Sequence, residues 1–156
     1  MGAIRIGLII MCWTVLAAPS LAQLNTLAPF TTDGCSMMLD GLPGDLPRWR
    51  HCCVAHDFDY WLGGTEKQRE LSDRRLELCI NEAASPMLGS FVYSNVRWGG
   101  SPFWVTTYRW GYGWPWWDAV VRQPRGYKIL TNDERQQADA LLPDARALLQ
   151  RELEAD

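Results

Sequence analysis

The residues best suited to chemistry are a histidine and the acidic residues that can reach it. Residues 52–60 read CCVAHDFDY, so His56 and Tyr60 lie four positions apart, on one face of a helix. Histidine is the side chain whose ordinary pKa suits it to take a proton from water near neutral pH. Such a base needs a carboxylate to fix its tautomer, and Asp73 is the candidate.

The cysteine spacing would allow Asp73 to reach His56. If Cys52 bridges Cys79, His56 lies about 6 Å along its helix from the bridge, at about 1.5 Å per residue. Asp73 lies about 9 Å along an antiparallel partner helix in the same direction, so the two side chains meet at nearly one level. A lone histidine on a helix is usually structural. The combination with the cysteines, the tyrosine and the distant aspartate therefore favours catalysis.

The neighbouring Asp57 points about 100° away from His56 around the helix. A bridge between Cys53 and Cys35 would hold the loop near Cys35 against that face. A carboxylate that faces backbone carbonyl oxygens forms a hard-oxygen site, and such a site suits calcium.

The chain has 156 residues, the length of one domain. Residues 1–22 contain one positive charge at Arg5, an apolar run over 6–18 and the small residues Ser20 and Ala22. We interpret them as a cleaved signal peptide. An uncleaved membrane anchor is the alternative, but the apolar run is short for a bilayer. The sequence predicts one domain over 23–156, secreted or periplasmic.

An even number of cysteines remains after this cleavage, which favours two disulfides in an exported chain. A bridge between adjacent cysteines is strained, so two of the three connectivities stay open. A zinc site is the competing interpretation, but it usually uses pairs about two to four residues apart. The four residues are Cys35, Cys52, Cys53 and Cys79.

The charge is mildly acidic, with a formal net value of −3. Such a domain has no electrostatic reason to bind nucleic acid. It should also not depend on anionic lipids for attraction to a membrane.

Glycine and proline interrupt residues 24–47, which we expect to be irregular. A first helix is predicted from near Pro47 to about Trp61. The pair of glycines at 63–64 should stop it. Thr65 and Gln68 form a capping-box pattern that starts a second helix, which ends at about residue 84. The short connection makes the two helices antiparallel neighbours.

A possible short third helix precedes a tryptophan-rich segment over 98–117, which we expect to be loop-rich. Its tryptophans suit a core, and Trp110, Trp116 and Trp117 equally suit a membrane-interface anchor. The capping-box pattern at Thr131 opens a C-terminal helix, which Pro143 should kink or divide.

The segment 52–60 resembles the active-site helix of the secreted phospholipase A2 family. Asp73 followed by Cys79 is similar to the family's second active-site segment, and 33–35 (DGC) resembles the start of its calcium loop. The resemblance covers residues 33–80. It implies the bridges Cys35–Cys53 and Cys52–Cys79.

The resemblance implies a mainly α fold with two antiparallel, disulfide-linked helices that carry the active site. A loop-rich calcium-loop region, the tryptophan-rich segment and the C-terminal helix complete the prediction. It also implies hydrolysis of the sn-2 ester of phospholipids at a bilayer or vesicle surface. The implied catalytic residues are His56, Asp73 and Tyr60, and calcium would be bound by Asp57 and by carbonyls near Gly34, Ser36 and Met38.

The loop after Cys35 lacks the closely spaced glycines of that family. This favours a second hypothesis, a catalytically silent lipid- or protein-binding module on the same scaffold. A third hypothesis is a structural, disulfide-stapled module in which the histidine and aspartate are incidental.

Overall fold

The computed structural model describes residues 26–36, 38–41, 48–115 and 125–155. Within these ranges the chain forms four helices and no strand, and two disulfides connect its segments. The predicted mainly helical class with two disulfides is therefore confirmed. The proposed signal over 1–22 lies outside the described residues.

The first helix, α1, spans Arg50–Leu62 and starts three residues later than the sequence pattern suggested. It ends where the chain needs glycine, because Gly63 and Gly64 have φ angles of 71° and 138°. A Cβ atom on Gly63 would also lie 2.8 Å from the Cα atom of Gly111. The glycine pair thus lets the loop that contains Gly111 approach the end of α1.

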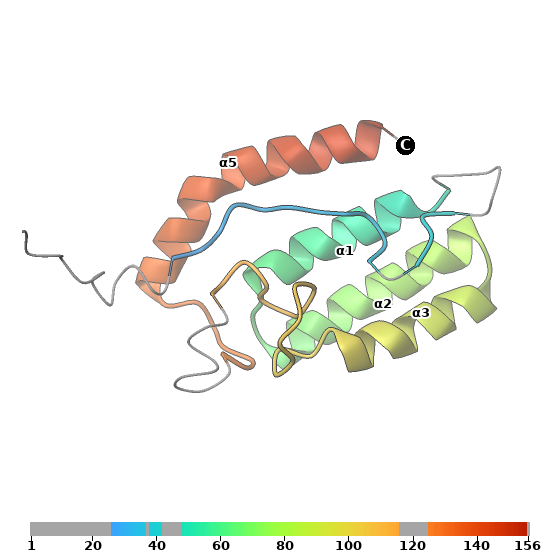
Figure 1. Ribbon diagram of the computed structural model, residues 1–156, viewed down its shortest axis with the longest axis horizontal. Coiled ribbons are helices and arrows are strands. Elements are labelled where there is room, and N and C mark those ends of the chain that lie inside the picture. The colour runs from blue at the N-terminus through green and yellow to red at the C-terminus, as the bar shows by residue number, and fades with distance from the viewer. Residues whose placement is uncertain (1–25, 37, 42–47, 116–124, 156) are drawn as a thin grey trace, which may run out of the picture.

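The second helix, α2, spans Glu66–Ala83 and begins with the predicted capping box. The Thr65 hydroxyl accepts from the backbone N–H of Gln68 at 3.2 Å, and the Gln68 side chain accepts from the Thr65 N–H at 2.8 Å. The short turn at 63–65 makes α2 run back along α1, as Figure 1 shows.

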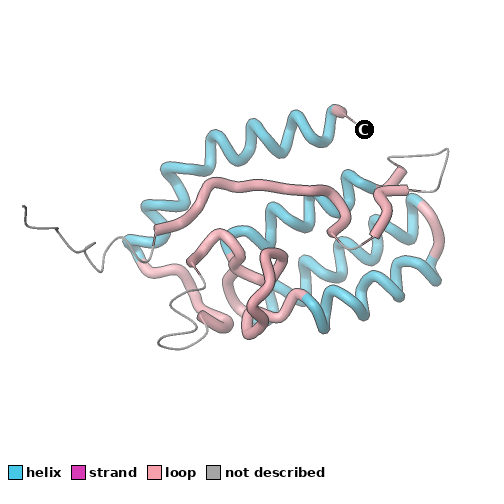
Figure 2. The backbone as a smooth tube through the Cα atoms, in the orientation of Figure 1, coloured by secondary structure: helices cyan, strands magenta, loops and turns pink. Residues whose placement is uncertain are grey.

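The third helix, α3, spans Pro86–Gly99 and is longer than the short helix that the sequence suggested. Ser85 caps it and Pro86 occupies its first turn, a strong start signal. Val92 packs with Leu76 and Ile80 in a core between α2 and α3. Figures 1 and 2 show these two helices lying side by side.

The C-terminal helix, α5, spans Asn132–Glu154 and starts at the predicted capping box of Thr131. Pro143 lies inside it without dividing it, and Figure 1 shows an axis that changes direction along the helix. The segment that starts at residue 26 runs between α5 and α1, where Leu27 joins Trp61 and Ala138 in a second core.

The disulfides are Cys35–Cys53 and Cys52–Cys79. The first ties the loop before α1 to that helix, and the second joins α1 to α2. Over the described part of the chain, no helix combines the length and apolar character needed to cross a bilayer.

We expect replacement of both Cys52 and Cys79 by alanine to lower the free energy of unfolding by about 2–5 kcal/mol, as for native bridges in small exported domains. The bridge joins residues 27 apart in sequence, so its loss frees a long loop in the unfolded chain. Urea unfolding of the variant and the parent measures the change. An unchanged midpoint would show that the bridge does not stabilise the domain.

Candidate active site

The two central helices bring His56 and Asp73 together. The His56 Nε2 atom lies 2.9 Å from Asp73 Oδ1, and the Tyr60 hydroxyl donates to the same oxygen at 2.6 Å. Asp73 is fully buried and His56 is nearly so. The pair therefore forms a largely desolvated dyad between α1 and α2.

The contact with Asp73 fixes the chemistry of the imidazole. An ionised carboxylate only accepts hydrogen bonds, so Nε2 must carry the proton and donate. Nδ1 is then the unprotonated ring atom, and it has no hydrogen-bond partner among the residues that the structure describes. His56 is thus oriented to accept a proton from water through Nδ1.

Asp73 is held in its ionised form despite its burial. Burial alone would raise its pKa, but hydrogen bonds from His56, Tyr60 and Arg97 outweigh that effect and lower the pKa. Arg97 donates to Asp73 Oδ2 at 2.7 Å, and Arg69 Nε lies 3.8 Å from the same oxygen.

Arg69 and Arg97 are site residues that sequence reasoning missed. Arg69 lies one turn before Asp73 on α2, so the spacing of four residues was a usable signal. Arg97 lies 24 residues after Asp73 on α3, and no local pattern relates the two.

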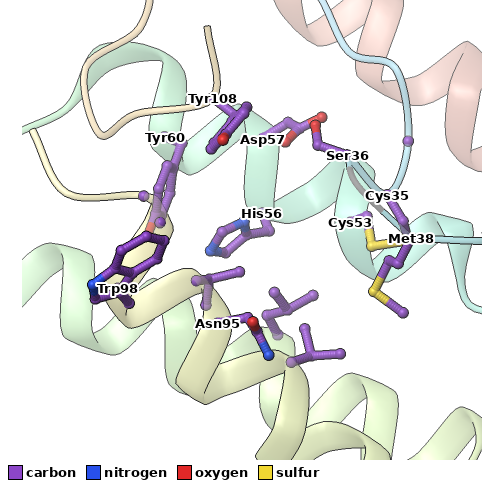
Figure 3. Close-up of a pocket in the computed structure, with 16 residues that line it drawn as sticks. Cys35, Ser36, Met38, Cys53, His56, Asp57, Tyr60, Asn95, Trp98 and Tyr108 are labelled. Atoms are coloured by element: carbon purple, nitrogen blue, oxygen red, sulfur yellow. A yellow bond between two sulfur atoms is a disulfide. The ribbon is translucent and has the colours of Figure 1, made fainter. Parts of the chain in front are cut away.

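A cavity of about 180 Å³ opens beside the dyad. His56, Asp57 and Tyr60 line it from α1. Figure 3 shows the His56 ring on the side of Trp98 and Asn95 of α3, and Asp57 turned toward Ser36. The remaining wall is mainly apolar. It includes Leu76, Val92, Val96 and the disulfide Cys35–Cys53. The cavity therefore has room for an apolar group beside the His56 imidazole.

Asp57 lies at the junction of this cavity and a second one of about 280 Å³, which Asp33 and Ser36 also line. The Thr32 hydroxyl donates to Asp57 Oδ2 at 2.6 Å, while Oδ1 accepts no hydrogen bond from any residue in the described ranges. Burial raises the pKa of Asp57 to about 7, and the charge of Asp33 adds to the increase.

The predicted loop ligands lie near Asp57, since Gly34, Ser36 and Met38 line the same cavity. Hydrogen bonds also form within the loop over residues 34–40. The Ser36 N–H donates to the Gly34 carbonyl at 3.1 Å, and the Cys35 N–H donates to Asp40 Oδ1 at 2.7 Å.

The donor atoms around Asp57 suit a hard cation. They comprise a carboxylate with one uncommitted oxygen and the carbonyl groups of loop residues that line the same cavity. A positive charge there would favour the ionised form of Asp57, which burial and Asp33 oppose. The residues present therefore fit calcium.

A second group of metal-type ligands is formed by His51, Cys52 and Cys79, whose ligand atoms lie within 4.8 Å of one another. Both cysteines are oxidised in one disulfide, so neither provides a thiolate. This cluster is not suited to hold a metal ion.

The structure corrects the prediction for Trp110. Its side chain is 3% exposed, and its indole N–H donates to the Gly64 carbonyl at 2.9 Å. Its ring packs edge-on against Tyr60, with centroids 4.9 Å apart. A buried ring cannot anchor a membrane interface, and Trp110 instead packs against Tyr60. Trp116 and Trp117 lie outside the described residues.

Comparison with known proteins gives no match: no family model matches the chain, and neither a curated protein nor a solved structure does.

Proposed function

We propose that the protein is a calcium-dependent hydrolase of the sn-2 ester of glycerophospholipids, similar to the secreted phospholipases A2. The observation that supports this most is the buried dyad of His56 and Asp73, which faces an apolar cavity with Asp57 beside it. A general base, an oxygen-rich cation site and an apolar channel are the three parts that lipid-ester hydrolysis needs.

In the proposed mechanism, Nδ1 of His56 takes a proton from a water molecule as that water attacks the ester carbonyl. The imidazolium then returns the proton to the leaving alcohol, and the products are a fatty acid and a lysophospholipid. Asp73 stabilises the transient imidazolium through Nε2, and Tyr60 orients Asp73.

Asp57, with carbonyl oxygens of Gly34, Ser36 and Met38, would hold the calcium ion. When bound, calcium polarises the ester carbonyl and stabilises the developing oxyanion. Among the described residues that line the cavity there is no lysine or arginine to serve in that role.

We further propose an extracytoplasmic location, because two disulfides are compatible with an oxidising compartment. The expected partner is a phospholipid bilayer or vesicle surface, and nucleic acid is not expected to bind.

A silent lipid- or protein-binding module remains a second candidate, favoured by the internal hydrogen bonds of the 34–40 loop. These bonds restrain the loop, and the Gly34 carbonyl already accepts one of them, which leaves it a single lone pair for a cation. A calorimetric calcium titration distinguishes the two functions, because only the hydrolase requires the ion.

The surface around the cavity mouth suggests how the protein would meet lipid. Trp98 lines the cavity and is 73% exposed, and its ring lies 5.5 Å from that of Trp104. Phe91, Phe103 and Val105 are also exposed. Residues 83–115 contain no acidic residue, so no carboxylate of this segment would lose its water when the surface meets lipid.

We expect alanine at both Trp98 and Trp104 to reduce hydrolysis of vesicles about tenfold and hydrolysis of dispersed short-chain phospholipid much less. Initial rates on both substrates measure the difference. Leu78→Ala is the matched control, because Leu78 is 60% exposed on α2 and does not line the cavity. Equal losses on vesicles and monomers would show that the two tryptophans do not contact the lipid surface.

The direct test of the proposed function is the release of fatty acid from a defined phospholipid by the purified protein, with calcium and with chelator. We expect release with calcium only. No release under either condition would remove the hydrolase proposal in favour of the silent module.

A further inference from the structure

Both oxygens of the Asp73 carboxylate on α2 are held by groups from α1 and α3. His56 and Tyr60 of α1 both bind its Oδ1 atom, so neither of them restrains Oδ2. Arg97 of α3 donates to Oδ2 at 2.7 Å from the opposite side. Without that contact Oδ2 would keep only the longer approach of Arg69 Nε at 3.8 Å, so the carboxylate could turn about its Cβ–Cγ bond and change its contact with His56.

Arg97 is itself fixed by a second arginine. Arg69 is 2% exposed and donates through one terminal nitrogen to the backbone carbonyls of Val96 and Arg97, at 2.8 and 2.6 Å. These carbonyls belong to the last turn of α3, where the Val96 carbonyl also accepts from the backbone N–H of Gly100 at 2.9 Å. Arg69 of α2 thus holds the C-terminal end of α3 at Arg97, the residue whose side chain donates to Asp73.

Arg69 also connects the same end of α3 to the tyrosine of the site. Its Nε atom donates to the Tyr60 hydroxyl at 3.0 Å, and its other terminal nitrogen donates to the Tyr127 hydroxyl at 2.6 Å. The Tyr60 hydroxyl, which accepts from Arg69, is thereby oriented to donate its own proton to Asp73.

We propose that Arg97 is a positioning residue for catalysis, and that Arg69 sets its place. Arg97 locks the carboxylate of Asp73 so that Oδ1 holds the Nε2–H tautomer of His56 and leaves Nδ1 as the base. This inference rests on the proposed function for its kinetic consequences. The orientation of His56 can be tested without any substrate.

The kinetic test compares Arg97→Gln and Arg97→Lys with the parent protein. We expect Arg97→Gln to lower kcat by about 10- to 100-fold, with KM changed by less than about twofold, because substrate binding does not involve Asp73. Lysine keeps the positive charge but not the fixed planar geometry that directs the Arg97 N–H at Oδ2, so it should restore part of the loss. Arg75→Gln is the control: Arg75 pairs with Asp59 on the exposed side of α2 and should leave kcat unchanged.

The substrate-free test follows the ring N–H of His56 by nuclear magnetic resonance. The chain has only two histidines, and the signal of His56 is assigned by its loss in His56→Gln. We expect a slowly exchanging Nε2–H in the parent and faster exchange in Arg97→Gln. If that variant does not fold, the same comparison is made with Arg97→Lys.

An unchanged kcat in folded Arg97→Gln, or a lower kcat without faster Nε2–H exchange, would overturn the positioning role. If the parent hydrolyses no phospholipid, the proposed function fails. The exchange measurement then decides the role of Arg97 alone.

Discussion

Replacing His56 by glutamine should lower the turnover of phospholipid by at least about 10²–10⁴-fold, the usual contribution of a positioned general base. Glutamine keeps a polar side chain that can still donate to Asp73 but has no group that takes a proton from water. Initial rates with calcium present measure the loss, and circular dichroism checks that the helices persist.

The matched control is the other histidine. His51 lies on the same helix near the Cys52–Cys79 bridge and does not line the cavity. We expect folded His51→Gln to retain the parent rate. Near-parental hydrolysis by folded His56→Gln would show that another group is the base.

Replacing Asp57 by asparagine should abolish the calcium response of hydrolysis. Of the described residues that line the cavity of His56, Asp57 alone carries a carboxylate, so its charge is the main attraction for a dication there. With one such ligand we expect weak binding in the parent, with a Kd of about 10⁻⁴–10⁻³ M as in extracellular modules. Calcium titration of chelator-treated protein, followed by the rate of hydrolysis, gives the response of each variant.

Asp139→Asn serves as the control for this change, because Asp139 is an exposed acid on α5 far along the chain from the loop. It should leave the calcium response unchanged. Full activity of the parent in chelator, or an unaltered response in Asp57→Asn, would remove the metal from the mechanism.

The elements with strong local signals were predictable from the sequence. The capping boxes at Thr65 and Thr131 start α2 and α5 where the pattern placed them, because their hydrogen bonds involve residues only three apart. The glycine pair after α1 likewise marks a stop, since the positive φ at Gly63 is a local requirement.

Features that depend on distant packing were not predictable. The length of α3 depends on its contact with α2, and the burial of Trp110 depends on its fit between Gly64 and Tyr60. A tryptophan in a glycine-rich loop has the same local pattern whether it fills a core or lies at a surface.

The candidate site likewise has one part that was predictable from the sequence and another that depends on tertiary packing. The sequence spacing placed Asp73 near His56, and the structure puts these side chains in contact. The roles of Arg69 and Arg97 arise where α3 ends against α2, so only the tertiary arrangement brings both cations to one carboxylate.

The most direct measurement of the central proposal uses a phospholipid that carries a different acyl chain at each glycerol position. The purified protein is incubated with it in calcium, and both fatty acids and both lysophospholipids are quantified by mass spectrometry. We expect only the sn-2 fatty acid and the complementary lysophospholipid, in equal amounts. The absence of product, or product that persists in folded His56→Gln, would contradict hydrolysis by the dyad of His56 and Asp73.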